Sequence, residues 1–174
     1  MNIKSSPDRY GTIAALIHWV SALAVILMLA SGQAMDWNRD AVGAVLPIHV
    51  SLGVLVGVLT LGRILWWVAF DRQPLPLAGT GRGQARLAKA VHLALYGAIA
   101  IMVASGIAML ALTGAVPQIF SGGALPRFDQ VAPFAAHSLV SKLLLVLVAG
   151  HIGAALWHHF VRRDGLIGRM GLGA

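Results

Sequence analysis

The histidines of the apolar stretch 137–160 are the residues in this sequence best suited to chemistry. His137 and His151 are fourteen positions apart, so in an α-helix they project within about 40° of each other and lie about 21 Å apart along the axis. His158 extends the same stripe. Buried imidazoles need hydrogen-bond partners or a metal. Three imidazoles at multiples of seven on one apolar face therefore indicate two stacked metal sites.

The composition is that of a protein embedded in a membrane. Of the 174 residues, 58% are hydrophobic and only 11% are charged, against about 25% in a soluble domain. The formal net charge of +7 could suit nucleic acid, but the basic residues lie in short loops beside apolar stretches, where they set membrane topology. We therefore expect membrane lipid, and no nucleic acid, as a partner.

Cysteine is absent from the sequence, which excludes disulfides, iron–sulfur clusters and covalently attached c-type haem. The seven histidines and six methionines are then the ligands available to a soft or borderline metal. Any haem here must be held without covalent attachment to the chain.

The apolar runs predict four spanning helices, at residues 11–31, 47–70, 87–113 and 133–161. The fold class expected is an all-α integral membrane four-helix bundle, with residues 1–174 as one domain. The first run could pass for a signal peptide, but it is longer than the usual apolar core of one and carries His18 followed by Trp19. Pro47 is expected in the first turn of the second helix, and Gly53 with Gly57 forms a GxxxG pattern that favours close helix contact.

The distribution of lysine and arginine predicts that both termini lie in the cytoplasm. The outer loops hold only Arg39 and Arg127 of these residues. The head, the middle loop with its flanking span ends, and the tail hold Lys4, Arg9, Arg63, Arg72, Arg82, Arg86, Lys89, Arg162, Arg163 and Arg169.

With this topology, four histidines pair by height in the membrane. His49 and His137 lie near the outer ends of their spans, and His18 and His151 lie at matching depth nearer the inner side. Two histidines without a carboxylate or thiolate complete a zinc or iron site poorly, whereas haem needs only two axial ligands because the macrocycle supplies four nitrogens. The pairs thus predict two haems; His92 is an alternative inner ligand.

Three further residues have candidate roles that follow from their positions. Arg63 lies fourteen residues after His49, at the height of the inner haem, where it could pair with a propionate or simply set topology. Lys142, inside the fourth span, could neutralise a propionate or draw in an anion, or snorkel to an interface. His158, below the inner haem, could bind a quinone carbonyl or relay its proton, or be an interfacial histidine.

These residues resemble the bacterial cytochrome b561 family. The resemblance rests on the segments IHW at 17–19, HVSLG at 49–53 with Arg63 behind it, VHLALYG at 91–97, and the last span with its four histidines. It implies a four-helix bundle in the bacterial inner membrane with two b haems, each held by two histidines. It also implies electron transfer between the periplasmic side and the quinone pool, with one branch of the family oxidising superoxide.

Three functions remain open at this point. The first is a haem-dependent oxidoreductase that passes electrons between an outer one-electron donor, for which superoxide is one candidate, and a quinone. The second is a non-catalytic cytochrome b subunit that relays electrons for a partner dehydrogenase. The third, a histidine-lined metal or proton transporter without haem, lacks the intramembrane carboxylates that such paths use. The outer loops carry Asp36, Asp40 and Asp129 against two arginines, which gives no positive surface for superoxide.

Overall fold

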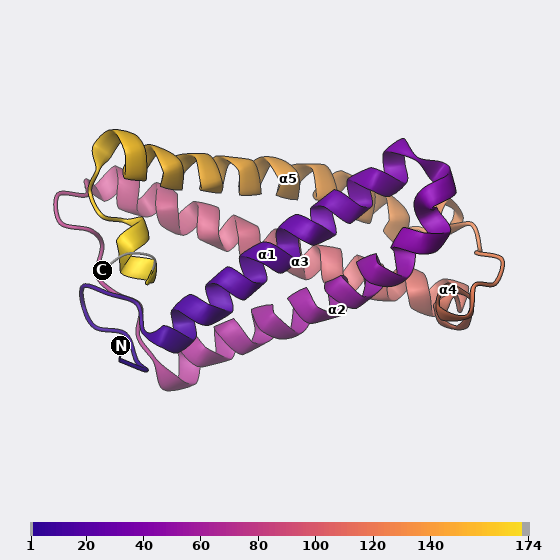
Figure 1. The fold of residues 1–174 in the computed structure, drawn as a ribbon, viewed down its shortest axis with the longest axis horizontal. Coiled ribbons are helices and arrows are strands. Elements are labelled where there is room, and N and C mark those ends of the chain that lie inside the picture. Colours follow the sequence, from indigo (N-terminus) through magenta and orange to yellow (C-terminus); the bar gives the residue numbers. More distant parts are fainter. Residues whose placement is uncertain (1, 172–174) are drawn as a thin grey trace. The chain divides into compact units, whose positions relative to one another are not determined.

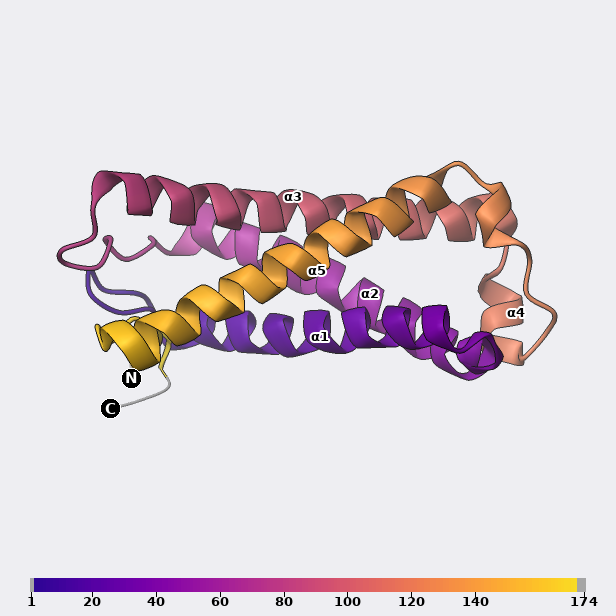
Figure 2. The same ribbon diagram turned by 90° about the horizontal axis from the view of Figure 1, so that it is seen from above.

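The computed structural model describes residues 2–171, and within them the chain forms helices, turns and loops without a strand (Figures 1 and 2). The long helices are α1 (Thr12–Trp37), α2 (Val42–Leu65), α3 (Arg82–Thr113) and α5 (Pro133–Trp157). A short helix, α4 (Val116–Ser121), lies between α3 and α5, and π-helical turns extend α2 through Trp66–Phe70 and α5 through His158–Arg162.

Four segments are long and apolar enough to cross a membrane: Thr12–Trp37, Arg39–Phe70, Arg82–Thr113 and Pro133–Arg162. At most 28% of the most apolar window of any of these segments is buried inside the protein, so most apolar side chains face outward, as a lipid-covered surface requires. The predicted all-α membrane fold with four spans is confirmed.

The helices extend past the ends predicted from the sequence, because the turn-forming residues at those ends do not stop them. α1 continues to Trp37, and α2 begins at Val42. Pro47 therefore lies inside α2 rather than in its first turn. At this interior position its missing N–H removes one hydrogen bond to the preceding turn. A single 3₁₀ turn, Arg39–Ala41, joins the two helices, and the Asn38 side chain caps it by accepting from the Asp40 N–H.

The two remaining loops also contain more helix than the sequence indicated. α3 begins at Arg82, five residues before the predicted position 87, because the arginines and glycine there do not prevent helix formation on a solvent-exposed turn. The predicted loop 114–132 contains α4, which has a proline in its first turn and ends at Gly122. Gly122 adopts a φ of 78°, the left-handed conformation that glycine adopts without strain.

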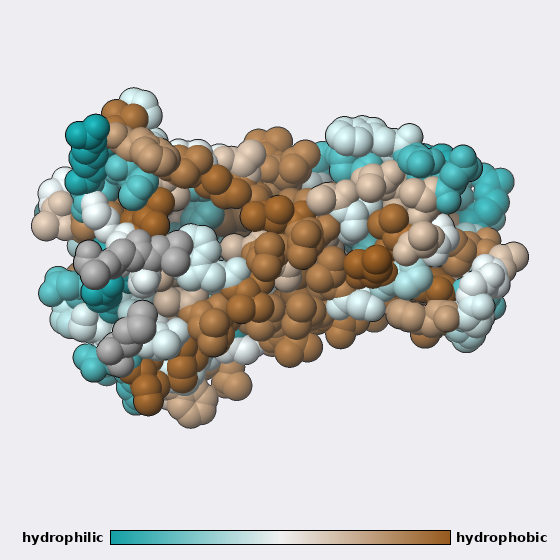
Figure 3. Space-filling model, viewed as in Figure 1, coloured by the Kyte–Doolittle hydropathy of each residue, from teal (hydrophilic) through white to brown (hydrophobic). Residues whose placement is uncertain are grey.

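The chain divides into two compact units. The first unit comprises Met1–Ser21, Leu59–Tyr96 and Val146–Ala174, and the second comprises Ala22–Val58 and Gly97–Leu145. Each unit holds a part of every long helix, so each brings residues distant in the sequence together. In each unit hydrophilic residues gather at the loops and hydrophobic ones cover the helices (Figure 3).

Two residues fasten the loop end of the first unit, and we call this pair the end clamp. Asp71 accepts hydrogen bonds from the Ser5 N–H and hydroxyl and from the Trp66 indole. Arg169 donates to the backbone carbonyl oxygens of Pro7, Asp8 and Leu75. Figure 1 shows the described segment before α1 and the described segment after α5 at this side of the unit. The head, the middle loop and the tail are thus held together.

Within the second unit, the two glycines of the GxxxG pattern contact neighbouring helices. A Cβ at Gly57 would lie 3.2 Å from Val103 of α3, and one at Gly53 would lie 3.7 Å from the sulfur of Met28 in α1. The glycines therefore allow α2 to approach both helices closely, which is the helix-contact role expected of such a pattern. This close approach positions His49, four residues before Gly53, at the interior of the unit.

Candidate functional site

The second unit brings His49 of α2 and His137 of α5 together. Their ring centres are 6.4 Å apart, and the ring planes are inclined by 67°. With metal–imidazole bonds of about 2 Å on opposite sides of one ion, and about 1.1 Å from each nitrogen to its ring centre, two such imidazoles have ring centres roughly 6.2 Å apart. The pair therefore has the spacing of two ligands on one iron.

Each of these histidines forms a hydrogen bond to a serine through its Nδ1 atom. The Ser31 hydroxyl lies 2.8 Å from Nδ1 of His49, and the Ser105 hydroxyl lies 2.9 Å from Nδ1 of His137. A metal-binding histidine normally donates its second ring N–H to such a partner, which fixes the ring. The arrangement leaves Nε2 of each imidazole to serve as the ligand atom.

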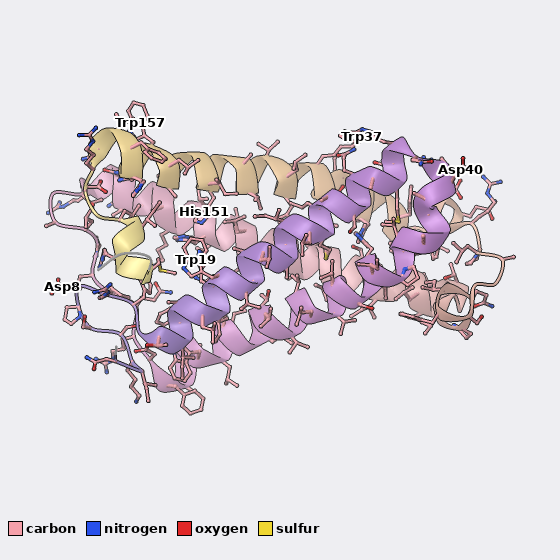
Figure 4. All side chains as sticks on the ribbon, in the orientation of Figure 1. Asp8, Trp19, Trp37, Asp40, His151 and Trp157 are labelled. Atoms are coloured by element: carbon pink, nitrogen blue, oxygen red, sulfur yellow. The ribbon has the colours of Figure 1, made fainter. Side chains whose placement is uncertain are left out.

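The first unit contains a cluster of imidazoles. The ring centres of His18 and His151 are 6.3 Å apart at 74°, which again matches two ligands on one iron. His92 lies 5.4 Å from His151, about an ångström closer than that spacing, and its side chain is exposed. Figure 4 shows His151 and Trp19 on the facing sides of α5 and α1. The spacing favours His18 over His92 as the partner of His151.

Arg63 of α2 points into this cluster rather than toward an interface. Its Nη1 donates to Nδ1 of His18 at 3.0 Å, and its guanidinium carbon lies 5.9 Å from the centre of the Tyr96 ring. Its Nε is buried without a hydrogen-bond partner in the described part of the chain. A buried donor left unpaired is costly, and a haem propionate is the kind of anion that would satisfy it.

The donor set decides between a bare metal ion and haem. Within residues 2–171, no group of three or more histidines, cysteines or carboxylates is arranged to hold a metal ion. A metal at either pair must therefore bring further ligands of its own, as haem iron does. The paired spacing, the serine-bound Nδ1 atoms and the unpaired Nε of Arg63 all fit haem.

His158 forms a separate polar cluster in the first unit. Its Nδ1 pairs with the carboxylate of Asp164, and its Nε2 lies 3.2 Å from the side-chain amide of Gln84. Arg162 lies 3.6 Å from the same carboxylate. Partial burial raises the pKa of Asp164, but the hydrogen bonds from His158 and the Leu166 N–H outweigh it and hold the pKa below its usual range. Asp164 is therefore an anion that orients His158.

The structure keeps two other predicted residues apart from these clusters. Lys142 is exposed on α5, whereas Leu144, two residues further along the helix, is almost fully buried. Five helical residues separate Lys142 from His137, which turns it about 140° away around the helix. Its position favours the snorkelling role over contact with a propionate. His159 is also exposed, with its ring against Phe160.

Sequence reasoning missed the two serines, although a signal for them was present. Residues 28–35 read MLASGQAM and residues 102–109 read MVASGIAM, so six of eight positions are identical. This repeat places a serine followed by a glycine at corresponding points of α1 and α3. Asp164 and Gln84 were also missed, since both lie in loops or helix ends where spacing carries no information about contact.

Apolar spanning helices that present paired imidazoles to one another define the class of b-type membrane cytochromes. The chain belongs to the prokaryotic cytochrome b561 family, whose model matches residues 9–173. It is 31% identical over 98% of its length to cytochrome b561 homolog 2 of Escherichia coli, of which the match covers 95%. It is 23% identical to cytochrome b561 homolog 1 of the same organism, over 94% of this chain and 97% of that one.

A third relative is a probable superoxide oxidase, CybB, of Yersinia pestis, which is 28% identical over 93% of this chain and 95% of its own. The family and the four spans identify a multi-pass protein of the bacterial inner membrane, as the sequence predicted. Its function is haem-b electron transfer within that membrane.

Proposed function

We propose that the chain holds two b haems and passes electrons from a one-electron donor on the outer side of the membrane to quinone. His49 and His137 would hold the outer haem, and His18 and His151 would hold the inner haem. The observation that carries this proposal is the spacing of the ring centres, 6.4 Å and 6.3 Å, in two separate pairs. Each haem supplies an iron that accepts and releases one electron.

At the inner pair, Arg63 would have to change partner for His18 to hold haem. A neutral imidazole has one ring nitrogen with a lone pair, so His18 cannot both accept from Arg63 and ligate a metal. To offer Nε2 to iron, His18 would carry its proton on Nδ1, which would free the guanidinium that now donates there. Arg63 then has Nη1 and the buried Nε free for a carboxylate, which supports its role as the propionate-binding residue.

His158 is the residue that we propose to supply protons to quinone. Reduction of a quinone to a quinol consumes two electrons and two protons, so a proton donor must lie beside the quinone carbonyl. Asp164 holds the Nδ1 side of the ring, and only a neutral amide, that of Gln84, lies at Nε2. A quinone oxygen in place of the amide would meet the nitrogen that exchanges the proton.

The outer donor is proposed from the reaction balance and one relative. Two superoxide ions lose one electron each and leave as oxygen, and one quinone takes up both electrons with two protons from the inner aqueous side. The similarity to a probable superoxide oxidase supports superoxide as the donor. Arg127, one of two outer-loop arginines, is paired with Asp129 at 2.9 Å, so no positive surface steers an anion here. We therefore expect slower capture of superoxide than steering would give.

The proposal is tested on the chain purified in detergent. A pyridine haemochrome assay should give two b haems per chain, and added superoxide should reduce them with quinone as final acceptor. One haem per chain would refute one of the pairs. Haem reduction that requires a copurifying dehydrogenase, with none by superoxide, would instead establish the relay-subunit function.

The membrane orientation belongs to the same proposal. Both termini face the cytoplasm if lysine and arginine set the topology. Fusion of a reporter that is active only in the periplasm to the C-terminus should give no signal, and the same reporter in the loop 114–132 should be active. The opposite pattern would place the inner haem at the periplasmic side and reverse the proposed path.

A further inference from the structure

The two serines that contact the outer histidines form the same arrangement twice, once on α1 and once on α3. Ser31 stands beside Gly32 on α1, and Ser105 stands beside Gly106 on α3, within the near-identical segments 28–35 and 102–109. Ser31 reaches His49 at 2.8 Å, and Ser105 reaches His137 at 2.9 Å. Two hydrogen bonds of the same kind thus arise from two copies of one sequence motif.

Because each serine hydroxyl has a single proton, the donor in each of the two serine–histidine hydrogen bonds can be assigned. The Ser31 hydroxyl also lies 2.8 Å from the carbonyl oxygen of Met28, and that of Ser105 lies 2.7 Å from the carbonyl oxygen of Ile101. A carbonyl oxygen accepts only, so each hydroxyl donates its single proton to its own helix. The hydroxyl oxygen then accepts from the histidine, whose proton must be on Nδ1. Both Nε2 atoms are left with a lone pair.

The neighbouring glycines leave space beside each ring. A Cβ added at Gly32 would lie 3.4 Å from Cε1 of His49, and one added at Gly106 would lie 3.5 Å from Cε1 of His137. The space beside each ring is therefore just wide enough for a Cβ in ordinary contact, and the glycines leave it open. The hydrogen bond from Nδ1 fixes the tautomer and the ring orientation of each histidine.

We propose that Ser31 and Ser105 are positioning residues that hold the two outer histidines in the Nδ1-protonated form and set the affinity and potential of the outer haem. This inference rests on the proposed assignment of that haem to His49 and His137. A hydroxyl acceptor makes a ligand histidine more electron-donating, which favours ferric iron. Loss of either serine should therefore raise the midpoint potential.

The test compares Ser31→Ala and Ser105→Ala with two control serines. Ser51 and Ser141 donate to carbonyl oxygens of their own helices in the same way, at 2.8 Å each, but have no histidine as a partner. Each test variant should weaken outer-haem binding by about 10- to 100-fold. The midpoint potential of the outer haem should rise by about 59 mV for each tenfold loss of haem affinity that affects the ferric form alone. Ser51→Ala, Ser141→Ala and the inner haem should not change.

A conservative variant and a spectroscopic measurement separate positioning from folding. Ser31→Thr keeps the hydroxyl and should restore the potential. In chains with ¹⁵N-labelled histidine, reduced so that low-spin iron is diamagnetic, the rings of His49 and His137 should be protonated at Nδ1. Protonation at Nε2, or test variants indistinguishable from the controls, would overturn the inference. The ring spectrum reports the tautomer whether or not haem is bound, so a failed haem assignment is recognised separately by the haem count.

Discussion

The histidine pairs of the two units have nearly the same ring spacing but different partners on the second nitrogen. In the second unit, neutral serine hydroxyls hold Nδ1 of both imidazoles. In the first unit, the cationic Arg63 holds Nδ1 of His18, and a third imidazole, His92, lies against His151. Under the proposed function, the outer pair would bind haem as it stands, whereas His18 of the inner pair would first have to release Arg63. Equal spacing does not imply equal chemistry.

An internal repeat in the sequence shows which residues make the two histidine pairs different. His18 and Ser31 recur 74 positions later as His92 and Ser105, whereas His49 recurs 88 positions later as His137. By the second offset, Arg63 corresponds to His151. The helix pairs α1–α2 and α3–α5 thus match at the outer site, where both halves supply a serine and a histidine. At the inner site one half carries an arginine in place of the histidine, which breaks the symmetry.

The largest effect expected is the loss of one haem with the other retained. His49→Ala and His137→Ala should each remove the same haem, because iron that keeps one of two axial imidazoles binds far more weakly. His18→Ala and His151→Ala should remove the other. Haem content and low-temperature difference spectra of the purified variants measure this. Loss of the same haem from His18→Ala and His49→Ala would refute the two pairs.

A second variant separates the chemistry at the inner side from haem binding. His158→Ala should lower the rate of quinone reduction by about 10²- to 10⁴-fold, the range for removal of a general acid, and should leave both haems in place. Asp164→Asn should give a smaller loss, since the ring is kept but its orienting anion is removed. Stopped-flow reoxidation of the reduced haems by quinone measures both. An unchanged rate in His158→Ala would assign the proton transfer to another group.

A substitution at Arg63 tests the difference between the inner and outer histidine pairs directly. Arg63→Gln removes a positive charge beside the inner haem, so ferric iron should be favoured by an energy on the order of 1 kcal/mol and the inner midpoint potential should fall. The outer potential should stay as it is. A redox titration that resolves the two haems gives the answer, and Arg72→Gln, which alters an exposed arginine of the middle loop, is a matched control. A fall of both potentials alike would contradict a local role.

The end clamp predicts an effect of acid on the first unit. Partial burial raises the pKa of Asp71, but hydrogen bonds from Ser5, the Arg72 N–H and Trp66 outweigh it and lower the pKa. A lowered pKa stabilises the fold above the unfolded value of about 3.9, and this stability is lost as the pH falls through the folded value. Asp71→Asn should cost about 1–2 kcal/mol at neutral pH and flatten the acid dependence. Thermal unfolding followed through the inner haem measures this, with the outer haem as reference.

The smallest effect is expected at Lys142. Because its side chain is exposed and turned away from His137, Lys142→Met should leave the outer potential and the rate of superoxide oxidation unchanged within error. A redox titration measures the potential, and reduction of the haems by added superoxide measures the rate. A clear change would restore the role in anion capture that its depth in the membrane first suggested.

Much of the fold could be predicted because apolar length and histidine spacing are properties of single helices. Four spans and the two pairs of histidines required only helical periodicity and membrane depth. Lys142 could also have been placed from its angle on the helix. The tautomers, the Arg63 contact and the cluster at His158 could not, because each depends on two helices meeting. α4 was missed because a proline and two glycines outweighed its short apolar run.

Arg169 has a consequence for the order in which the molecule assembles. Its guanidinium donates to three carbonyl oxygens that belong to the head and the middle loop. Those segments are synthesised well before it, since the chain is made from its N-terminus. The carbonyl oxygens cannot receive these bonds until α5 has entered the membrane and the tail has folded back. Arg169 can therefore join these three segments only after the chain has been made through residue 169, which comes after both histidine pairs in the sequence.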